Sequence, residues 1–246
     1  MNQTVNMPLD VVIMAAGKGT RMKSALPKVL QRLGGKPLLQ HVVETAAELK
    51  ARSVVVITGH QSEVVVNALN SMNQSFCAIN NIAEDAINTP ATANNAPILA
   101  INNVLQEPQL GTGHAVQQAV PKLPDDGMVL VLSGDVPLTQ ADTLNALIAL
   151  ANGEKLALLT IDFANPVGYG RVVRSDKHSG DKVTAIVEQK DASEAQKLIT
   201  EVYSGIMAVP AKLLKAWLAR LDNKNAQSEY YLTDIVKFAV ADGIAV

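Results

Sequence analysis

The sequence predicts an α/β protein of Rossmann-like type, with a single mixed, mainly parallel sheet and helices on both faces. Apolar runs rich in β-branched residues alternate with amphipathic segments, and this alternation favours parallel strands joined by right-handed crossovers. A chain of 246 residues that is 48% apolar can bury a core of that size. Glycine-containing polar stretches follow two of the apolar runs, at the carboxyl ends of strands where such sheets bind ligands.

The elements of the first two thirds of the chain follow from their periodicity. Short apolar runs bounded by polar residues predict strands at LDVVIM (9–14), SVVVIT (53–58), MVLVLS (128–133) and KLALLTI (155–161). Longer segments with apolar residues three and four apart predict helices at PLLQHVVETAAELK (37–50), SEVVVNAL (62–69) and LTQADTLNALIALA (138–151).

Two regions depart from this rhythm. From about Phe163, the stretch at 168–191 predicts a two-stranded excursion with a polar turn, followed by a helix, a strand at 202–209 and a last pair of helices. We expect that half to form a wall or lid over the strand ends. Between Asn70 and Asn103 the chain is rich in Asn, Ala and Pro, which predicts an irregular, solvated insertion.

Composition excludes several classes of protein. The balance of 21 Lys and Arg against 23 Asp and Glu argues against a nucleic-acid partner, which would need a broad basic surface. A lone Cys77 excludes an internal disulfide framework and a cysteine-based zinc site, and it fits a reducing cytoplasm. The first ten residues lack a secretory signal, and no apolar run is long enough to span a bilayer. We therefore expect a cytoplasmic protein without a membrane partner.

The glycine-rich stretch AAGKGTRM at 15–22 directly follows the first predicted strand. Gly17 and Gly19 would let consecutive backbone N–H groups approach a phosphate closely. Arg21 adds a planar fork for phosphoryl oxygens, and Lys28 adds a compact charge after the rigid Pro27. The pattern is neither a Walker loop nor GxGxxG. Taken alone, it is equally typical of a tight turn with a surface arginine.

Several motifs in order carry a resemblance to a known family. MAAGKGTRMxSxxPK at 14–28 resembles the signature of sugar-1-phosphate nucleotidyltransferases. The match narrows through QLGTGHA (109–115), GDVPL (134–138), GYGR (168–171), IVEQKDA (186–192) and NAQSEYYLTD (225–234). Together they are similar to the uridylyltransferase half of bifunctional N-acetylglucosamine-1-phosphate uridylyltransferase/glucosamine-1-phosphate acetyltransferases. The resemblance implies the nucleotide-diphospho-sugar transferase fold, with UTP and N-acetylglucosamine 1-phosphate as substrates and UDP-N-acetylglucosamine and pyrophosphate as products.

The resemblance also implies a nucleotide half of the site. Arg21 and Lys28 would neutralise the phosphates as catalytic groups, and Gln106 and Gln109 would read the uracil edge, since an amide both donates and accepts. The remaining positions would line and close this half: Met14, Ala15, Ala16, Gly17, Gly111, Thr112, Ser133 and Gly134. The nucleophile, a phosphate, is already ionised and needs no general base, so His60 and His114 are interpreted as structural.

Asp135 is the candidate metal ligand. Its carboxylate follows a buried strand beside Gly134, so it can face phosphates at the sheet edge, where Mg²⁺ takes one or two carboxylates and fills its shell with water and phosphate oxygens. The alternative is a helix cap near Leu138. The resemblance places a further ligand, an Asn, in a segment after the last helix, and Asn225 belongs to a different motif.

The sugar half rests on the resemblance and departs from it at one position. The implied contacts are the backbone of Gly170, the carboxylate of Glu188, and Tyr231 and Thr233 beside the acetamido group. The family often has Asn in E-[IV]-N-[ST]-G, whereas this chain has Tyr203, which we expect to border the sugar. A different sugar 1-phosphate therefore stays an alternative substrate, and a catalytically silent nucleotide-binding module is a second alternative.

The domain organisation expected from the resemblance is simple. Residues 1–246 form one uridylyltransferase domain, with the Asn-rich insertion near 70–103. The sequence contains no hexapeptide repeats, so we expect the acetyltransferase β-helix domain to be absent. This chain is then expected to be monomeric, and a full-length chain trimeric.

Overall fold

The computed structural model describes residues 7–17, 19, 22–79, 99–175 and 181–246, and it places them in an eight-stranded mixed sheet with helices on both faces. The strand order is β5-β4-β1-β6-β10-β8-β9, and β7 also pairs with β10. Four adjacent strands are parallel: β1 (Leu9–Met14), β4 (Ser53–Thr58), β5 (Ala100–Leu105) and β6 (Met128–Ser133). The predicted mixed, mainly parallel α/β sheet is confirmed.

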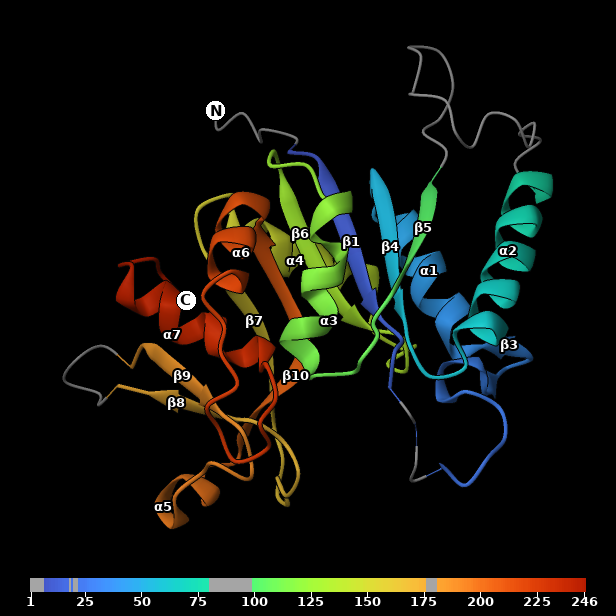
Figure 1. Cartoon of the computed structure of the whole chain (residues 1–246). Helices are drawn as coiled ribbons and strands as arrows, with labels where there is room; N and C mark the ends of the chain where they lie inside the picture. The colour runs from blue at the N-terminus through green and yellow to red at the C-terminus, as the bar shows by residue number, and fades with distance from the viewer. Residues whose placement is uncertain (1–6, 18, 20–21, 80–98, 176–180) are drawn as a thin grey trace.

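The long strand β10 (Glu201–Pro210) joins the parallel half of the sheet to an antiparallel half. It runs antiparallel to β6, to β7 (Ala157–Asp162) and to β8 (Arg171–Arg174), which in turn pairs with β9 (Val183–Val187). The β8–β9 pair is the predicted excursion, and Figure 1 shows it at the end of the sheet toward which the parallel strands run. A separate hairpin consists of β2 (Arg32–Leu33) and β3 (Lys36–Pro37).

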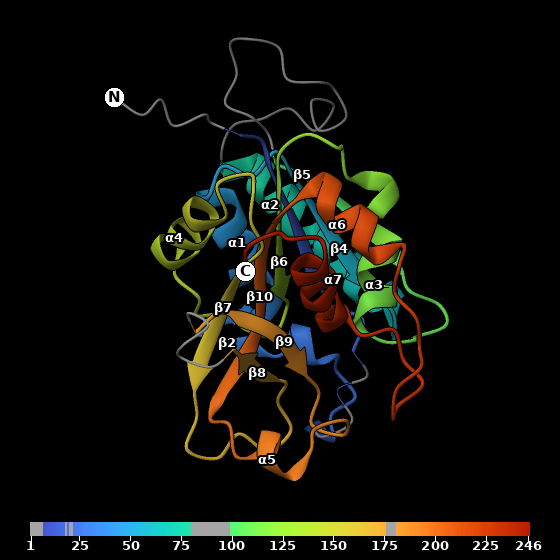
Figure 2. The ribbon, with the colours of Figure 1, turned by 90° about the vertical axis from the view of Figure 1, so that its left-hand side faces the viewer.

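The helices form two layers because the side chains of each strand alternate between the faces of the sheet. Val11 and Ile13 of β1 pack with α1 (Leu38–Glu48), α2 (Ser62–Ile79) and α4 (Ala141–Ala151). Val12 packs with α3 (Thr112–Ala119), α6 (Ala211–Leu218) and α7 (Ile235–Ala241) on the other face. Figure 2 shows these two layers on either side of the sheet. Each fully buried valine or isoleucine contributes about 1.5–3 kcal/mol, so the alternation fixes both layers and the register.

The short helical elements lie in connections. α5 (Glu194–Lys197) follows β9 and begins with a capping box, in which Ser193 and Gln196 satisfy each other's backbone N–H groups. Among the described residues, 3₁₀ turns cover Lys28–Leu30, Val120–Lys122 and Leu232–Asp234. Within the described ranges, no helix is long and apolar enough to cross a membrane.

Two boundaries of the predicted insertion are wrong. The helix expected over 62–69 continues as α2 to Ile79, because Val65, Leu69 and Met72 repeat at helical spacing and are buried against the sheet. The other end of the insertion forms β5, whose two asparagines lie on the exposed edge of the sheet. Residues 80–98 lie outside the described residues. The helix predicted from 138 begins at Ala141, with Gln140 as its N-cap.

Candidate active site

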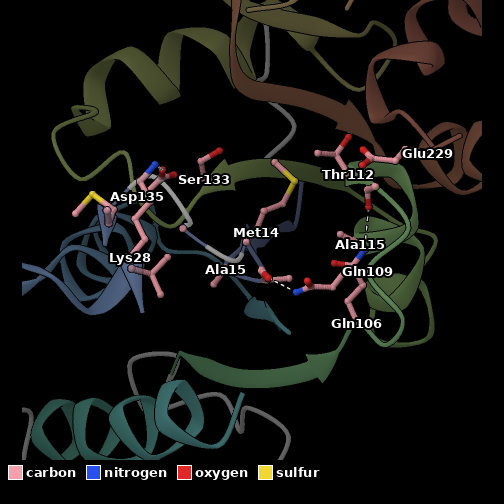
Figure 3. Close-up of a pocket in the computed structure, with 16 residues that line it drawn as sticks. Met14, Ala15, Lys28, Gln106, Gln109, Thr112, Ala115, Ser133, Asp135 and Glu229 are labelled. Atoms are coloured by element: carbon pink, nitrogen blue, oxygen red, sulfur yellow. Dashed lines mark hydrogen bonds and ion pairs between the residues drawn. The ribbon is translucent and has the colours of Figure 1, made fainter. Parts of the chain in front are cut away.

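The strand ends enclose a cavity of about 720 Å³ at the point where the strand order reverses. After β1 the chain forms β4 on one side of β1, and it later forms β6 on the other side. Because the connections leave in opposite directions, a crevice opens beyond the carboxyl ends of β1 and β6. Figure 3 shows the side chains that converge there. The lining residues are Met14, Ala15, Ala16, Gly17, Gly19, Met22, Lys28, Val29, Gln106, Gln109, Gly111, Thr112, Ala115, Ser133, Asp135 and Glu229.

The turn after β1 lets the backbone form one wall of this cavity. Ala15 and Ala16 are buried, and the N–H of Ala15 donates to the carbonyl of Ile57 at 2.9 Å, so the chain stays tied to the sheet beyond the end of β1. Gly19 has φ +56°, and a Cβ there would lie 3.1 Å from the Cβ of Lys28. Glycine is favoured at this position because the left-handed backbone and the close approach of Lys28 coincide. Arg21 lies outside the described residues.

Lys28 and Asp135 lie together at one side of the cavity and form an ion pair between Nζ and Oδ2 (Figure 3). Lys28 begins the 3₁₀ turn after Pro27, and Asp135 follows β6. Gly134 anchors the aspartate, because its N–H donates to the Met14 carbonyl at 2.9 Å. The helix-cap alternative for Asp135 is wrong, since Gln140 holds the N-cap position of α4.

The two glutamines hold the opposite wall together through their side-chain amides. Gln106 is buried, and its Nε2 donates to the carbonyl of Gly111 at 2.9 Å. Gln109 Nε2 donates to the carbonyl of Ala16. Gly59 permits this contact, because a Cβ there would clash with Gln109 Nε2 and would lie 2.9 Å from the carbonyl oxygen of Ala16. The Gln106 amide therefore closes the loop between β5 and α3 on itself, and the Gln109 amide ties this loop to the turn after β1, while both side chains line the cavity (Figure 3).

The start of α3 is joined to the segment that precedes α7. Gly113 donates to the carbonyl of Tyr230 at 2.7 Å, and Thr112 Oγ1 accepts from the N–H of Leu232 at 3.0 Å. These bonds bring Glu229 into the cavity wall. His114 lies between Gln106 and Gln118 through its two ring nitrogens, which fits its structural interpretation.

The predicted sugar-side residues form a second group across β10, β8 and β9. The N–H of Tyr203 donates to the carbonyl of Gly170 at 3.0 Å, and a Cβ on Gly170 would lie 3.6 Å from both carboxylate oxygens of Glu188. Thr233 Oγ1 donates to Glu188 Oε1 at 2.9 Å, and Tyr231 Oη donates to Asp191 Oδ2 at 3.1 Å. Among the described residues, these five predicted positions do not line the strand-end cavity.

The sequence of the chain matches the model of a known family over most of its length. The model of the MobA-like NTP transferase domain matches residues 11–193, which is well over half of the chain. The chain belongs to the MobA-like NTP transferase family.

Relatives in this family cover almost the whole chain. The sequence is 62% identical over 239 residues to bifunctional protein GlmU of Polaromonas naphthalenivorans, and 66% identical over 238 residues to that of Albidiferax ferrireducens. Each match covers 97% of this chain and 46% of the relative. The chain therefore spans about half the length of the curated relatives that it matches.

Solved structures with the same fold are more distant in sequence. UDP-glucose pyrophosphorylase in complex with UDP-glucose has a TM-score of 0.72 and 18% identity, over 98% of this chain and 89% of that one. The UDP-glucose pyrophosphorylase from Acinetobacter baumanii has a TM-score of 0.67 and 22% identity, over 98% and 85%. At these identities the likeness shows a shared fold alone.

Burial and neighbouring charges shift the pKa values of three of the predicted sugar-side residues. Burial raises the pKa of Glu188, and the nearby carboxylates Asp234 and Asp191 add to this, while the hydrogen bond from Thr233 opposes it. Burial also raises the pKa of Tyr203, and burial together with the bond to Asp191 raises that of Tyr231 to about 12. Within the described part of the chain, the buried Oη of Tyr203 has no hydrogen-bond partner.

The donors at the strand ends fit a hard divalent cation of the magnesium type. Asp135 supplies a carboxylate, whereas Glu229 lies on the opposite side of the same cavity (Figure 3). The described ranges contain no cluster of three or more His, Cys, Asp or Glu, which a closed metal site would need. Mg²⁺ fits such a sparse set because water and substrate phosphates complete its octahedral shell.

Four lining residues escaped the sequence interpretation: Met22, Val29, Ala115 and Glu229. Val29 is an apolar residue in a short helical element and carries no signal that distinguishes a cavity wall from core, whereas Met22 and Ala115 lie inside the motifs at 14–28 and 109–115. Glu229 lies inside the motif at 225–234, so its polar type in that motif was the available signal.

Proposed function

We propose that this NTP transferase moves UMP from UTP to N-acetylglucosamine 1-phosphate, which yields UDP-N-acetylglucosamine and pyrophosphate. The observation that carries the proposal is the cavity at the strand-order reversal, lined by the motif residues through which the chain resembles uridylyltransferases. The 62–66% identity to bifunctional GlmU over 97% of the chain supports the same reaction. Because the chain spans 46% of those relatives, the proposal concerns this one activity.

UTP binds with its base between the two walls and its phosphates toward Lys28. Ala15 and Ala16 present little side-chain volume, so a planar ring can lie against the turn after β1. Gln106 and Gln109 each keep an amide face toward the cavity, and an amide can both donate to and accept from a uracil edge (Figure 3). The backbone at Gly17 and Gly19 and the ammonium of Lys28 meet the phosphates. The role of Arg21 stays a prediction.

The reaction requires positioning and charge neutralisation more than proton transfer. A phosphate oxygen of the sugar phosphate attacks the α-phosphorus of UTP in line, and pyrophosphate leaves. Lys28 exchanges its contact with Asp135 for the phosphates, where its charge offsets the negative charge that develops on the leaving group. Bound at Asp135, Mg²⁺ would supply positive charge that brings the two anionic substrates together.

The sugar is recognised by the group around Glu188. A carboxylate oxygen of Glu188 already accepts from Thr233 at 2.9 Å, and its remaining capacity suits a sugar hydroxyl. Gly170 packs closely against the next strand beside that carboxylate, because a Cβ there would lie 2.8 Å from Ile186 Cγ2 and 3.6 Å from both carboxylate oxygens. Within the described residues, the Oη of Tyr203 is buried and has no hydrogen-bond partner, so it would reach a ligand only after the groups that cover it move.

Another sugar 1-phosphate is the second candidate substrate. It is favoured by Tyr203, which stands where the resemblance implies Asn and is larger and hydrophobic over most of its length. A change of this size beside Gly170 alters the space available to the sugar ring.

Pyrophosphate release over a panel of substrates tests the proposal. We expect turnover with UTP and N-acetylglucosamine 1-phosphate in the presence of Mg²⁺, and much lower kcat/KM with glucose 1-phosphate, galactose 1-phosphate or other nucleotides. A preference for another sugar would replace the substrate assignment. Binding of UTP without pyrophosphate release from any pair would instead identify a silent nucleotide-binding module.

A further inference from the structure

Arg171 is a buried cation whose role the proposed reaction does not explain. Its side chain is 1% exposed, and within the described residues it makes no ion pair with a carboxylate. Arg174, on the same strand, has the usual arrangement, with a bidentate pair to Glu201 at 2.7 and 2.8 Å. Removing a guanidinium from water without an anion is unfavourable, because neutral acceptors replace only part of its hydration. A purely stabilising role is therefore a poor explanation for Arg171.

The guanidinium of Arg171 joins two segments that flank the sugar group. One arm, Nη1, donates to the carbonyl of Tyr169, and the other arm, Nη2, donates to Oε1 of Gln189 at 2.7 Å. The same Gln189 oxygen accepts from the N–H of Gly168 at 3.1 Å. These three bonds connect residues 168–169, which precede β8, to the residue that follows Glu188 after β9. We call Arg171 and Gln189 the clip.

The bonds of the clip flank two of the predicted sugar-side residues, Gly170 and Glu188. Gly170 lies between Tyr169 and Arg171, and Glu188 directly precedes Gln189. The backbone of Gly170 already accepts from Tyr203, and the carboxylate of Glu188 lies beside it. Fixing both flanks therefore fixes the separation between the Gly170 backbone and the Glu188 carboxylate.

The Arg171 side chain and the sugar-side groups lie on opposite faces of β8 and β9. Val172, Ile186 and Tyr203 belong to the buried cluster on the face covered by α3, α6 and α7. Because neighbouring residues of a strand point to opposite faces, Arg171 points away from the face of Val172. Its guanidinium is thus separated from the sugar group by the β8–β9 backbone, and it acts through its neighbours.

We propose that Arg171 and Gln189 are positioning residues that hold Gly170 and Glu188 in the geometry that binds the sugar phosphate. The sugar-binding consequence rests on the proposed function, whereas the ordering of residues 168–170 by the clip does not. A misplacement of about 1 Å at a binding group can cost up to about a hundredfold in rate, so a remote clip can have a measurable effect.

Matched variants separate positioning from folding. Arg171→Met and Gln189→Leu each remove the clip, and we expect the KM for the sugar 1-phosphate to rise about tenfold while the KM for UTP changes less than about twofold. Gln189→Glu keeps an oxygen that can accept from both Arg171 and Gly168, so its kinetics should stay close to those of the wild type. Arg174→Met removes an arginine from the same strand without touching the clip, and its two KM values should both stay near the wild-type values.

Hydrogen exchange gives a second measurement that does not depend on catalysis. The amide of Gly168 donates to Gln189, so its exchange should accelerate in Gln189→Leu and Arg171→Met but not in Gln189→Glu or Arg174→Met. Unchanged exchange in the first two variants would overturn the clip. Faster exchange together with equal changes in both KM values, or with unchanged KM values, would overturn the positioning role. If the wild type turns over no substrate pair, the proposed function fails, and the exchange pattern still decides whether the clip exists.

Discussion

The nucleotide half and the sugar half of the candidate site solve different binding problems. The nucleotide half lies at the ends of parallel strands, where Lys28 and backbone groups face a cavity of about 720 Å³. The sugar half lies on antiparallel strands, where burial, and to a smaller extent the nearby carboxylates Asp234 and Asp191, raise the pKa of Glu188. A polyanion needs exposed positive charge, whereas neutral hydroxyls need buried acceptors in fixed positions. The two halves differ accordingly in charge and in burial.

The difference also lies in how much of each half is already paired. Lys28 and Asp135 neutralise each other in the nucleotide half and can exchange partners when phosphates bind. The sugar half is tied by hydrogen bonds from Thr233 to Glu188 and from Tyr203 to Gly170, and Tyr203 Oη is left without a partner within the described residues. We infer that substrate binding rearranges the nucleotide half and fills the sugar half.

The largest effect is expected from Lys28→Ala. Loss of this charge should lower kcat by about 10²–10³, because a preorganised cation at the leaving phosphate stabilises the transition state more than the bound substrate. Pyrophosphate release and UTP calorimetry measure the two effects separately. Lys36→Ala is the matched control. Lys36 Nζ pairs with Glu44 Oε1 at 2.9 Å, and neither residue lines the cavity. Equal losses in UTP affinity and kcat/KM, with kcat unchanged, would make Lys28 a ground-state binding residue.

Asp135→Asn should have the next largest effect, again confined to the nucleotide half. The amide keeps the shape but loses the charge that attracts a divalent cation, so turnover at a fixed Mg²⁺ concentration should fall about tenfold to a hundredfold. Binding of Mn²⁺, followed by electron paramagnetic resonance, should weaken in parallel. The exposed Asp142→Asn, in the first turn of α4, serves as the control. Unchanged Mn²⁺ binding would remove Asp135 from the metal site.

The nucleotide half was more accessible to sequence interpretation than the sugar half, for a physical reason. Its residues directly follow strands, so the apolar run that predicts β1 or β6 also predicts where Gly17 or Asp135 lies. The sugar half assembles from four separate segments, and periodicity gives no information on how β8, β9 and β10 meet. Only the family resemblance pointed to Gly170, Glu188 and Thr233.

The amino-acid composition of β5 and of the second half of α2 made these two elements hard to predict. Asparagines in the edge strand β5 and along α2 resemble loop residues, because a partly exposed element needs few apolar side chains.

Buried polar contacts were equally hard to predict from the sequence. The motif at 168–171 includes Arg171, but its bonds to Tyr169 and Gln189 depend on how the strands pair. Such contacts are specified by tertiary structure, and a linear pattern does not contain them.

Substitutions at Tyr203 test whether the sugar half binds the sugar 1-phosphate independently of UTP. Tyr203→Phe removes a hydroxyl that is buried without a partner, so it should stabilise the free protein by about 1 kcal/mol. If the hydroxyl serves the ligand, the same change should weaken sugar 1-phosphate binding about threefold to tenfold and leave UTP binding unchanged. Urea unfolding and the two KM values measure these effects.

Tyr203→Asn tests the same position by size. It restores the residue that the resemblance implies, and we expect it to change the relative kcat/KM of N-acetylglucosamine 1-phosphate and glucose 1-phosphate. Equal changes for both sugars and for UTP would contradict the division between the two halves.

The smallest effect concerns the pH dependence of stability at Glu188. Burial raises its folded-state pKa above the unfolded value, so the protonated carboxyl stabilises the fold below the unfolded pKa, and this contribution is lost as pH rises through the folded pKa. Glu188→Gln keeps an acceptor for Thr233 without the buried charge, and should therefore raise the free energy of unfolding at pH 7 by less than about 1 kcal/mol, with little gain near pH 4. The exposed Glu194→Gln is the control, with little difference between the two pH values. A larger gain for Glu188→Gln at pH 4 than at pH 7 would show that Glu188 is stabilised as a carboxylate, and the electrostatic contrast between the two halves would then be wrong.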